Sequence, residues 1–215
     1  IAQQVPENRH VQIDPDTSIN EFSYQAALRA AGAAVLASNL VASGQAPVAF
    51  CNIRPPGHHA ERSNAGGVCF FNNVAVGIRH AISHHGIERI ALIDFDVHHG
   101  NGSEDILFDD PHVLMCSIFE KNLYPFCGDV PMGANMVNVG LPTRSGSEAF
   151  RQAVSEVWMP ALEKFQPEMI FISAGFDGHR EDDMGNLALV EADYEWVTKQ
   201  IVMIAQRYSH GRIVS

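Results

Sequence analysis

Apolar and polar positions along this chain predict strands and helices in alternation. Short apolar runs predict strands at 47–52, 90–93, 113–118, 137–141 and 169–173, with another starting at residue 213. Helical spacing predicts helices at 21–41, 70–84, 104–108, 148–165 and 189–208, the fourth interrupted near Pro160. This alternation favours an α/β fold, a single mostly parallel sheet with helices on both faces.

Two segments carry no such pattern. Residues 1–19 are polar and predict irregular structure, and residues 119–135 predict an ordered loop. The chain begins at Ile1 rather than Met and stops as a core strand begins. We therefore expect one domain spanning 1–215, incomplete at both ends.

Polar clusters follow four of the predicted strands. They stand after Asn52, at 94–98, at Ser117 and at Asp177. Ligand sites in open parallel sheets form at the carboxyl ends of strands. The four clusters therefore predict a single active-site crevice at that edge.

The stretch Asp94-Phe95-Asp96-Val97-His98 is the centre of this prediction. If the backbone stays extended, Asp94, Asp96 and His98 share one face. Asp177, after another apolar strand, is the natural third ligand beside Asp96 and His98. Two carboxylates and an imidazole would form an oxygen-rich zinc site with room for water. The competing interpretations are a polar strand end with satisfied hydrogen bonds and, for Asp177, a turn cap.

The tandem His58-His59 lies in a rigid Pro-Pro-Gly loop and is the candidate acid/base unit. A histidine bonded to a carboxylate such as Asp94 has a raised pKa, whereas one bonded to the neutral Asn101 can accept a proton near pH 7. The pair His84-His85 ends a predicted helix, where we expect it to face the helix dipole and solvent.

Composition limits the classes of binding partner and the cellular compartment that we expect. The net charge of -11 argues against direct nucleic-acid binding and is compatible with cationic substrates such as lysine peptides or polyamines. No apolar run approaches a membrane span. The four cysteines show no C-x-x-C spacing. Cys51, Cys69 and Cys116 lie in apolar surroundings, which favours buried thiols of a reducing compartment, and we expect the cytoplasm.

Four motifs together resemble the zinc-dependent histone deacetylase family, most closely its class II members and bacterial deacetylase-like amidohydrolases. They are Arg54–Ala60, Gly67–Asn73, Asp94–Gly102 and Ser173–Asp177. The resemblance covers nearly all of the chain. It implies an arginase-like fold with one eight-stranded parallel sheet, and hydrolysis of acetyl-lysine or acetylpolyamine amides.

The resemblance also implies roles for individual residues. One zinc ion per chain would be held by Asp96, His98 and Asp177. His59 would be the base oriented by Asn101, and His58 its electrostatic or acid partner oriented by Asp94. A structural potassium ion would take Asp94, the Ser117 hydroxyl and the carbonyls of Asp96, His98 and Ile118. The substrate channel would be lined by Gly67, Val68, Tyr124 and Met184.

This sequence departs from the family pattern at several positions. Val68 stands where the family has a channel aromatic, and Phe119 where many members have histidine. The Tyr or His that polarises the substrate carbonyl lies in a Gly-Gly-Tyr motif beyond the last residue printed, so we expect the printed chain to be a poor catalyst. Polyamine-specific relatives have an acidic residue near Met184. Methionine there favours an acyl-lysine substrate.

Other functions remain open at this point. A binuclear manganese ureohydrolase shares the fold but needs more bridging carboxylates than this chain offers. An acetylpolyamine deacetylase and a catalytically impaired acyl-lysine binding module are the alternatives within the family. The sequence leaves open whether the chain forms a homo-oligomer.

Overall fold

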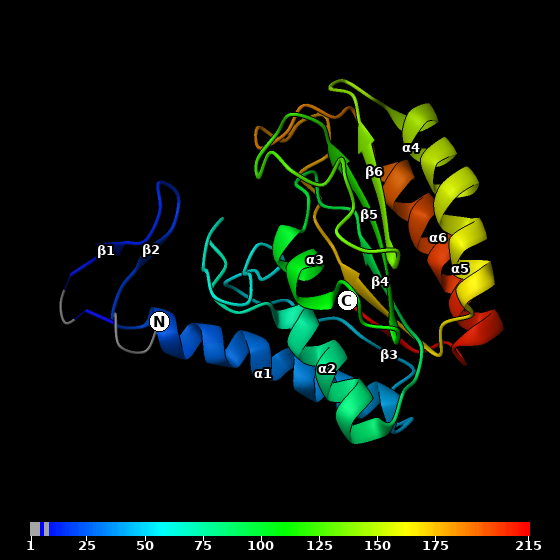
Figure 1. Ribbon diagram of the computed structural model, residues 1–215, viewed down its shortest axis with the longest axis horizontal. Helices are drawn as coiled ribbons and strands as arrows, with labels where there is room; N and C mark the ends of the chain where they lie inside the picture. The colour runs from blue at the N-terminus through cyan, green and yellow to red at the C-terminus, as the bar shows by residue number, and fades with distance from the viewer. Residues whose placement is uncertain (1–4, 7–8) are drawn as a thin grey trace.

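The computed structural model describes residues 5–6 and 9–215, and within them six strands form one parallel sheet (Figure 1). The spatial order is β3-β8-β7-β4-β5-β6, and each neighbouring pair is parallel. The strands are β3 (Val48–Ala49), β4 (Ile90–Asp94), β5 (Val113–Glu120), β6 (Met136–Leu141), β7 (Met169–Ser173) and β8 (Ile213–Val214). The predicted single parallel sheet is confirmed, with six strands in the described chain where the resemblance implied eight.

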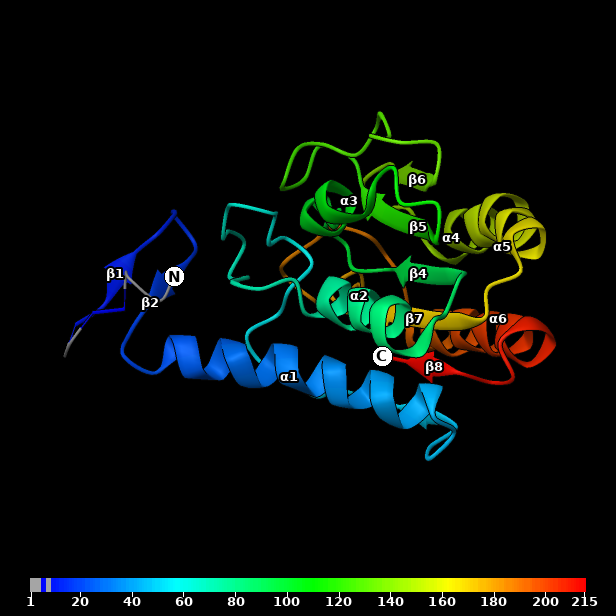
Figure 2. The ribbon, with the colours of Figure 1, turned by 60° about the horizontal axis from the view of Figure 1, so that its bottom comes forward.

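Helices cover both faces of the sheet, as Figures 1 and 2 show. One face is covered by α1 (Ser23–Ala42), α2 (Asn73–His85) and the short α3 (Asn101–Leu107). The other is covered by α4 (Ser147–Ala153), α5 (Met159–Phe165) and α6 (Glu191–Tyr208). Each face has its own apolar core.

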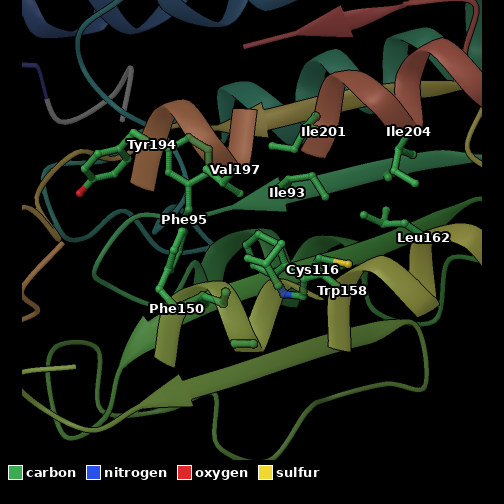
Figure 3. Close-up of a cluster of buried hydrophobic side chains, with 14 of the residues drawn as sticks. Ile93, Phe95, Cys116, Phe150, Trp158, Leu162, Tyr194, Val197, Ile201 and Ile204 are labelled. Atoms are coloured by element: carbon green, nitrogen blue, oxygen red, sulfur yellow. The ribbon is translucent and has the colours of Figure 1, made fainter. Parts of the chain in front are cut away.

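The central strand β4 supplies both cores with alternate side chains. Ala91 and Ile93 belong to the core under α4–α6, whereas Ile90 and Leu92 belong to the core under α1 and α2. All four are fully buried. Burying each large side chain contributes roughly 1.5–3 kcal/mol, which fixes the register of β4. Figure 3 shows Ile93 within the first of these cores. Polar chemistry on this strand is therefore confined to its carboxyl end.

Several predicted boundaries move in the structure. The helix expected from residue 70 begins at Asn73, because the Asn72 side chain caps it by accepting from the Ala75 N–H at 3.0 Å. The interruption expected near Pro160 is a π-helical turn at Val154–Trp158, which ends two residues before that proline. A proline removes one helical N–H donor and crowds the preceding turn, which explains the local change.

The stretch expected to be irregular contains a small antiparallel hairpin, β1 (Val11–Gln12) with β2 (Ser18–Ile19). Residues 1–4 and 7–8 of that stretch lie outside the described residues. Thr17 is fully buried, and its hydroxyl accepts a hydrogen bond from the Val68 N–H at 2.8 Å. The hairpin thus supports the loop that begins at Gly66. Among the described residues, no helix combines the length and apolar character that crossing a membrane requires.

Candidate metal centre

The metal-binding stretch does not stay extended, which corrects the prediction. Strand β4 ends at Asp94, and two turns follow. The Asp94 Oδ1 accepts from the Asp96 N–H at 3.2 Å, and the Asp96 Oδ1 accepts from the His98 N–H at 2.8 Å. Short acidic side chains readily satisfy nearby N–H groups in this way and so replace the strand ladder.

Asp96, His98 and Asp177 nevertheless converge on one point. The His98 Nδ1 lies 3.0 Å from the Asp96 Oδ1 and 3.0 Å from the Asp177 Oδ2. One ligand atom from each of the three lies within 4.8 Å of the others. The other Asp177 oxygen accepts from the Val97 N–H at 2.9 Å, which orients the carboxylate. At Gly175 a Cβ atom would lie 2.1 Å from the Asp96 Oδ2, so only glycine lets this turn approach so closely.

The charges of this trio favour a bound cation. Burial lowers the pKa of His98, but its hydrogen bonds to Asp177 and Asp96 outweigh burial and raise the pKa to about 10. Burial raises the pKa of Asp96, but the His58 and His98 charges hold it below its usual range. Burial and the charge of Asp96 raise the pKa of Asp177. Two carboxylates facing one imidazole nitrogen match the three protein ligands of a catalytic zinc site.

The tandem histidines lie beside this trio and have different partners. The His58 Nδ1 is 3.0 Å from the Asp94 Oδ2, and the His59 Nδ1 is 2.8 Å from the Asn101 Oδ1. Both histidines are 7% exposed, and their ring centroids are 4.0 Å apart. The structure thus brings together the two pairs that the resemblance implied.

The two histidines also differ in protonation. Burial lowers the pKa of His58, but the charges of Asp96 and Asp94 raise it to about 9. Burial and the positive charge of His58 lower the pKa of His59 to about 3. At neutral pH the pair therefore holds one imidazolium and one neutral imidazole.

Two of the four residues expected to line a substrate channel, Gly67 and Tyr124, lie against the His59 ring. A Cβ on Gly67 would lie 2.5 Å from the His59 ring and 3.0 Å from Tyr124. The Tyr124 ring centroid is 4.9 Å from that of His59. Val68 follows Gly67, is 48% exposed, and adopts φ 58°, an unusual conformation for a β-branched residue. Met184 is 61% exposed.

The residues of the expected potassium site lie directly under the histidines. Asp94 and Ser117 are both fully buried and are paired across β4 and β5. Ile118 follows in β5, while Asp96 and His98 follow in the turns after β4. The Asp94 carboxylate contacts His58, and the Ser117 Oγ lies 3.3 Å from the His99 Nδ1.

Two polar contacts at the site had no signal in the sequence. The Asn101 Nδ2 donates to the Glu61 Oε1 at 2.8 Å, forty positions away along the chain. The buried His99 Nε2 lies 2.7 Å from the Glu104 Oε2, and Glu104 also accepts from the Met132 N–H at 3.0 Å. This second pair ties α3 to the long loop that carries Tyr124. A hydrogen bond between Glu61, in a loop, and Asn101, at the start of α3, follows no periodicity that a sequence pattern could reveal.

Comparison with known proteins places this geometry in a family. The model of the histone deacetylase domain matches residues 2–215. The type-2 histone deacetylase 2 of Dictyostelium discoideum is 42% identical over 219 residues, covering 93% of this chain and 13% of that protein.

Two solved structures share the fold. The HDA15 HD domain has a TM-score of 0.85 at 30% identity, covering 95% of this chain and 61% of that one. The acetylpolyamine aminohydrolase from Burkholderia pseudomallei also has a TM-score of 0.85, at 31% identity, covering 94% and 59%. The chain thus spans between 13 and 61% of the length of these three proteins. Because the histone deacetylase domain model matches nearly its whole length and its architecture is arginase-like, the chain belongs to the histone deacetylase family.

Proposed function

We propose that this chain carries the catalytic centre of a zinc-dependent amidohydrolase that removes acetyl or other acyl groups from lysine side chains. The observation that carries the proposal is the convergence of two carboxylates on the His98 Nδ1, at 3.0 Å each, beside a buried pair of unequal histidines. Asp96, His98 and Asp177 would hold the metal. Zinc, when bound, would polarise the acyl carbonyl and acidify a water molecule.

The chain's own residues would then divide the proton chemistry. Neutral His59 would accept a proton from the attacking water, because only an unprotonated imidazole can act as a base. His58, held as an imidazolium by Asp94 and Asp96, would stabilise negative charge that develops on the substrate. On collapse of the tetrahedral species, the proton carried by His59 would pass to the leaving amine.

The substrate stem would enter beside Tyr124, which lies against both Gly67 and the His59 ring. Tyr124 offers an aromatic wall beside His59, and Gly67 leaves room because any side chain there would meet both rings. Val68 at the exposed rim lacks an aromatic face. A channel with one aromatic wall holds a thin stem less tightly and leaves space for a bulkier acyl group.

An acetylated polyamine is the second candidate substrate, favoured by the similarity to the Burkholderia acetylpolyamine aminohydrolase. The two structural comparisons are equally close in TM-score, so they do not separate the candidates. Met184 supports acyl-lysine, because a thioether cannot pair with a distal ammonium group. Glu181 and Asp182, which are close in sequence and exposed, favour the polyamine instead, because a carboxylate can pair with a distal ammonium group.

Turnover on two substrates would test this choice. We expect the zinc-loaded protein to prefer an acetyl-lysine peptide over N-acetylputrescine. Met184→Glu should shift the ratio of the two kcat/KM values toward N-acetylputrescine, whereas Met203→Glu, an equally bulky change at an exposed position of α6, should not. A wild-type preference for N-acetylputrescine would contradict the acyl-lysine assignment. Release of acetate from neither substrate by the full-length protein would favour a binding module.

We further propose that potassium occupies the site beneath the histidines. The support is the fully buried Asp94 carboxylate, with the buried Ser117 hydroxyl beside it on the next strand. His58 contacts only one oxygen of this buried carboxylate, and a cation would neutralise it further. The protein should therefore unfold at a higher temperature in potassium chloride than in tetramethylammonium chloride at equal ionic strength, and Ser117→Ala should reduce that difference.

The remaining proposals concern the cellular compartment and the binding partners. Cys51, Cys69, Cys116 and Cys127 are free thiols, which supports the reducing cytoplasm as location. The net charge of -11 supports a partner other than nucleic acid.

A further inference from the structure

The side chain of Asn101 lies between two partners that require opposite ends of its amide. Its Oδ1 is 2.8 Å from the His59 Nδ1, and its Nδ2 donates to the Glu61 Oε1 at 2.8 Å. The other Glu61 oxygen accepts from the Asn64 Nδ2 at 3.0 Å, and the Glu61 N–H donates to the Asn64 carbonyl at 2.9 Å. Glu61 is thus held in a closed turn with both carboxylate oxygens engaged.

The chemistry of these groups determines the orientation of the amide. A carboxylate only accepts hydrogen bonds, so the Asn101 NH2 group must face Glu61. The amide oxygen must then face His59, and an oxygen can only accept. The His59 Nδ1 therefore carries a proton. A neutral imidazole has one N–H, which leaves the Nε2 lone pair free.

We infer that Glu61 is a positioning residue that, through Asn101, holds His59 in its Nδ1–H tautomer and so keeps Nε2 available as a proton acceptor. The inference rests on the proposed function for the use of that lone pair. The tautomer itself follows from the contacts alone.

Without Glu61 the side-chain amide of Asn101 could rotate by about 180°. Its NH2 group could then donate to the His59 Nδ1, which would favour the Nε2–H tautomer. That tautomer has no lone pair on Nε2 and cannot accept a proton there. A neutral asparagine can orient a histidine in either sense, and the neighbouring carboxylate selects one.

Glu61→Lys tests this most sharply, because an ammonium group donates and would draw the Asn101 oxygen toward itself. Nitrogen-15 NMR of the histidine side chains in zinc-loaded protein distinguishes the two tautomers. We expect a protonated Nδ1 on His59 in the wild type and a protonated Nε2 in Glu61→Lys, with kcat lowered about tenfold or more and zinc content unchanged. Glu61→Gln keeps an acceptor oxygen and should retain the tautomer and most of the turnover.

Two further variants serve as control and rescue. Glu88→Lys makes the same charge change at an exposed position outside the site and should alter neither readout. Asn101→Asp should itself lower kcat, because it places a second carboxylate beside Glu61. Adding Asn101→Asp to Glu61→Lys should restore the Nδ1–H tautomer and recover turnover, because an aspartate has no donor to offer His59.

The outcomes test the His59 tautomer and the base role of His59 separately. A wild-type His59 protonated at Nε2 would overturn the inference without any variant, even if Glu61→Lys failed to fold. An unchanged Nδ1–H tautomer in folded Glu61→Lys would overturn it as well. A reversed tautomer with normal kcat would support the inference and contradict the base role that the proposed function gives to His59.

Discussion

Two tandem histidine pairs in this chain look alike in sequence and have different surroundings. His58-His59 is 93% buried at the carboxyl edge of the sheet, whereas His84 is exposed and His85 half-buried in the last turn of α2. His58 contacts the carboxylates of Asp94 and Asp96. The His80 and His85 Nε2 atoms instead each lie 2.7 Å from a neutral amide oxygen, that of Asn39 in α1.

The difference shows which surroundings make a group of histidines a metal-binding and acid/base site. Both regions hold several imidazoles close together, and the His80 and His84 rings are stacked at 4.1 Å. Only the first region adds burial and carboxylates, which separate the pKa values of neighbouring histidines and attract a cation. Among the described residues, the histidines of α2 form no ion pair with a carboxylate. His84 is exposed, as predicted, whereas His85 is half-buried and contacts Asn39 instead of solvent.

Removing a metal ligand should have the largest effect. Asp177→Asn should lose most of the bound zinc and lower activity at least about a hundredfold, because a three-ligand site tolerates loss of a charged ligand poorly. Zinc content by atomic emission and turnover on an acetyl-lysine peptide measure this. Asp183→Asn, an exposed aspartate in the same loop, is the matched control. Full zinc occupancy in Asp177→Asn would exclude that carboxylate as a ligand.

The histidine pairs themselves should rank next. His59→Ala should lower kcat by about a hundredfold to ten-thousandfold, because it removes the proposed base. His58→Ala should cost less, and His84→Ala should stay within about twofold of wild type, as exposed substitutions usually do. Zinc content should stay near normal in all three. If His58→Ala were the more damaging at neutral pH, the roles within the pair would be reversed.

Much of this contrast could be predicted from the sequence. The parallel sheet follows from strand–helix alternation, and parallel strands bring their carboxyl ends to one edge, so Asp96, His98 and Asp177 could be grouped despite their separation. The expected extended path to His98 was wrong, yet the grouping survived, because the turns after Asp94 still direct both side chains toward Asp177.

Polar contacts between elements that are distant in the sequence could not be predicted. The Glu61–Asn101 hydrogen bond and the bonds from His80 and His85 to Asn39 each join residues about forty positions apart. Such pairs depend on the exact packing of α1, α2 and the loop before α2, for which hydrophobic periodicity gives no information. The hairpin at residues 11–19 was missed because its two strands are only two residues long.

Widening or narrowing the channel should change selectivity moderately. Val68→Phe should shift the ratio of kcat/KM values toward acetyl-lysine and away from a larger acyl-lysine by about tenfold, because it adds an aromatic wall opposite Tyr124. Val130→Phe makes the same change at a position that is 84% exposed and should leave the ratio unchanged. An unchanged ratio in Val68→Phe would mean that residue 68 does not line the channel.

The smallest effect should be on the pH dependence of stability, and it should come from the histidines of α2. Burial and the charges of His84 and His85 lower the pKa of His80 below its ordinary 6.5. As the pH falls below 6.5, His80 takes up a proton in the unfolded chain before it does so in the folded protein. The free energy of unfolding therefore decreases. Urea titrations at pH 7.5 and 5.5 should show a smaller decrease for His80→Gln than for wild type. The difference should be a fraction of the limit of about 1.4 kcal/mol per pH unit for one proton.

His10→Gln removes an exposed histidine and controls for the change of residue type. A decrease in His80→Gln equal to that of wild type would show that His80 titrates alike in the folded and unfolded states.

Anomalous diffraction at the zinc absorption edge, from crystals grown with one equivalent of zinc, compares the two histidine regions directly. The account predicts a single strong peak in contact with Asp96, the His98 Nδ1 and Asp177, with His59 beside it and no metal ligand among His80, His84 and His85. A dominant peak at the histidines of α2, or a peak near β4 that does not touch Asp177, would contradict it.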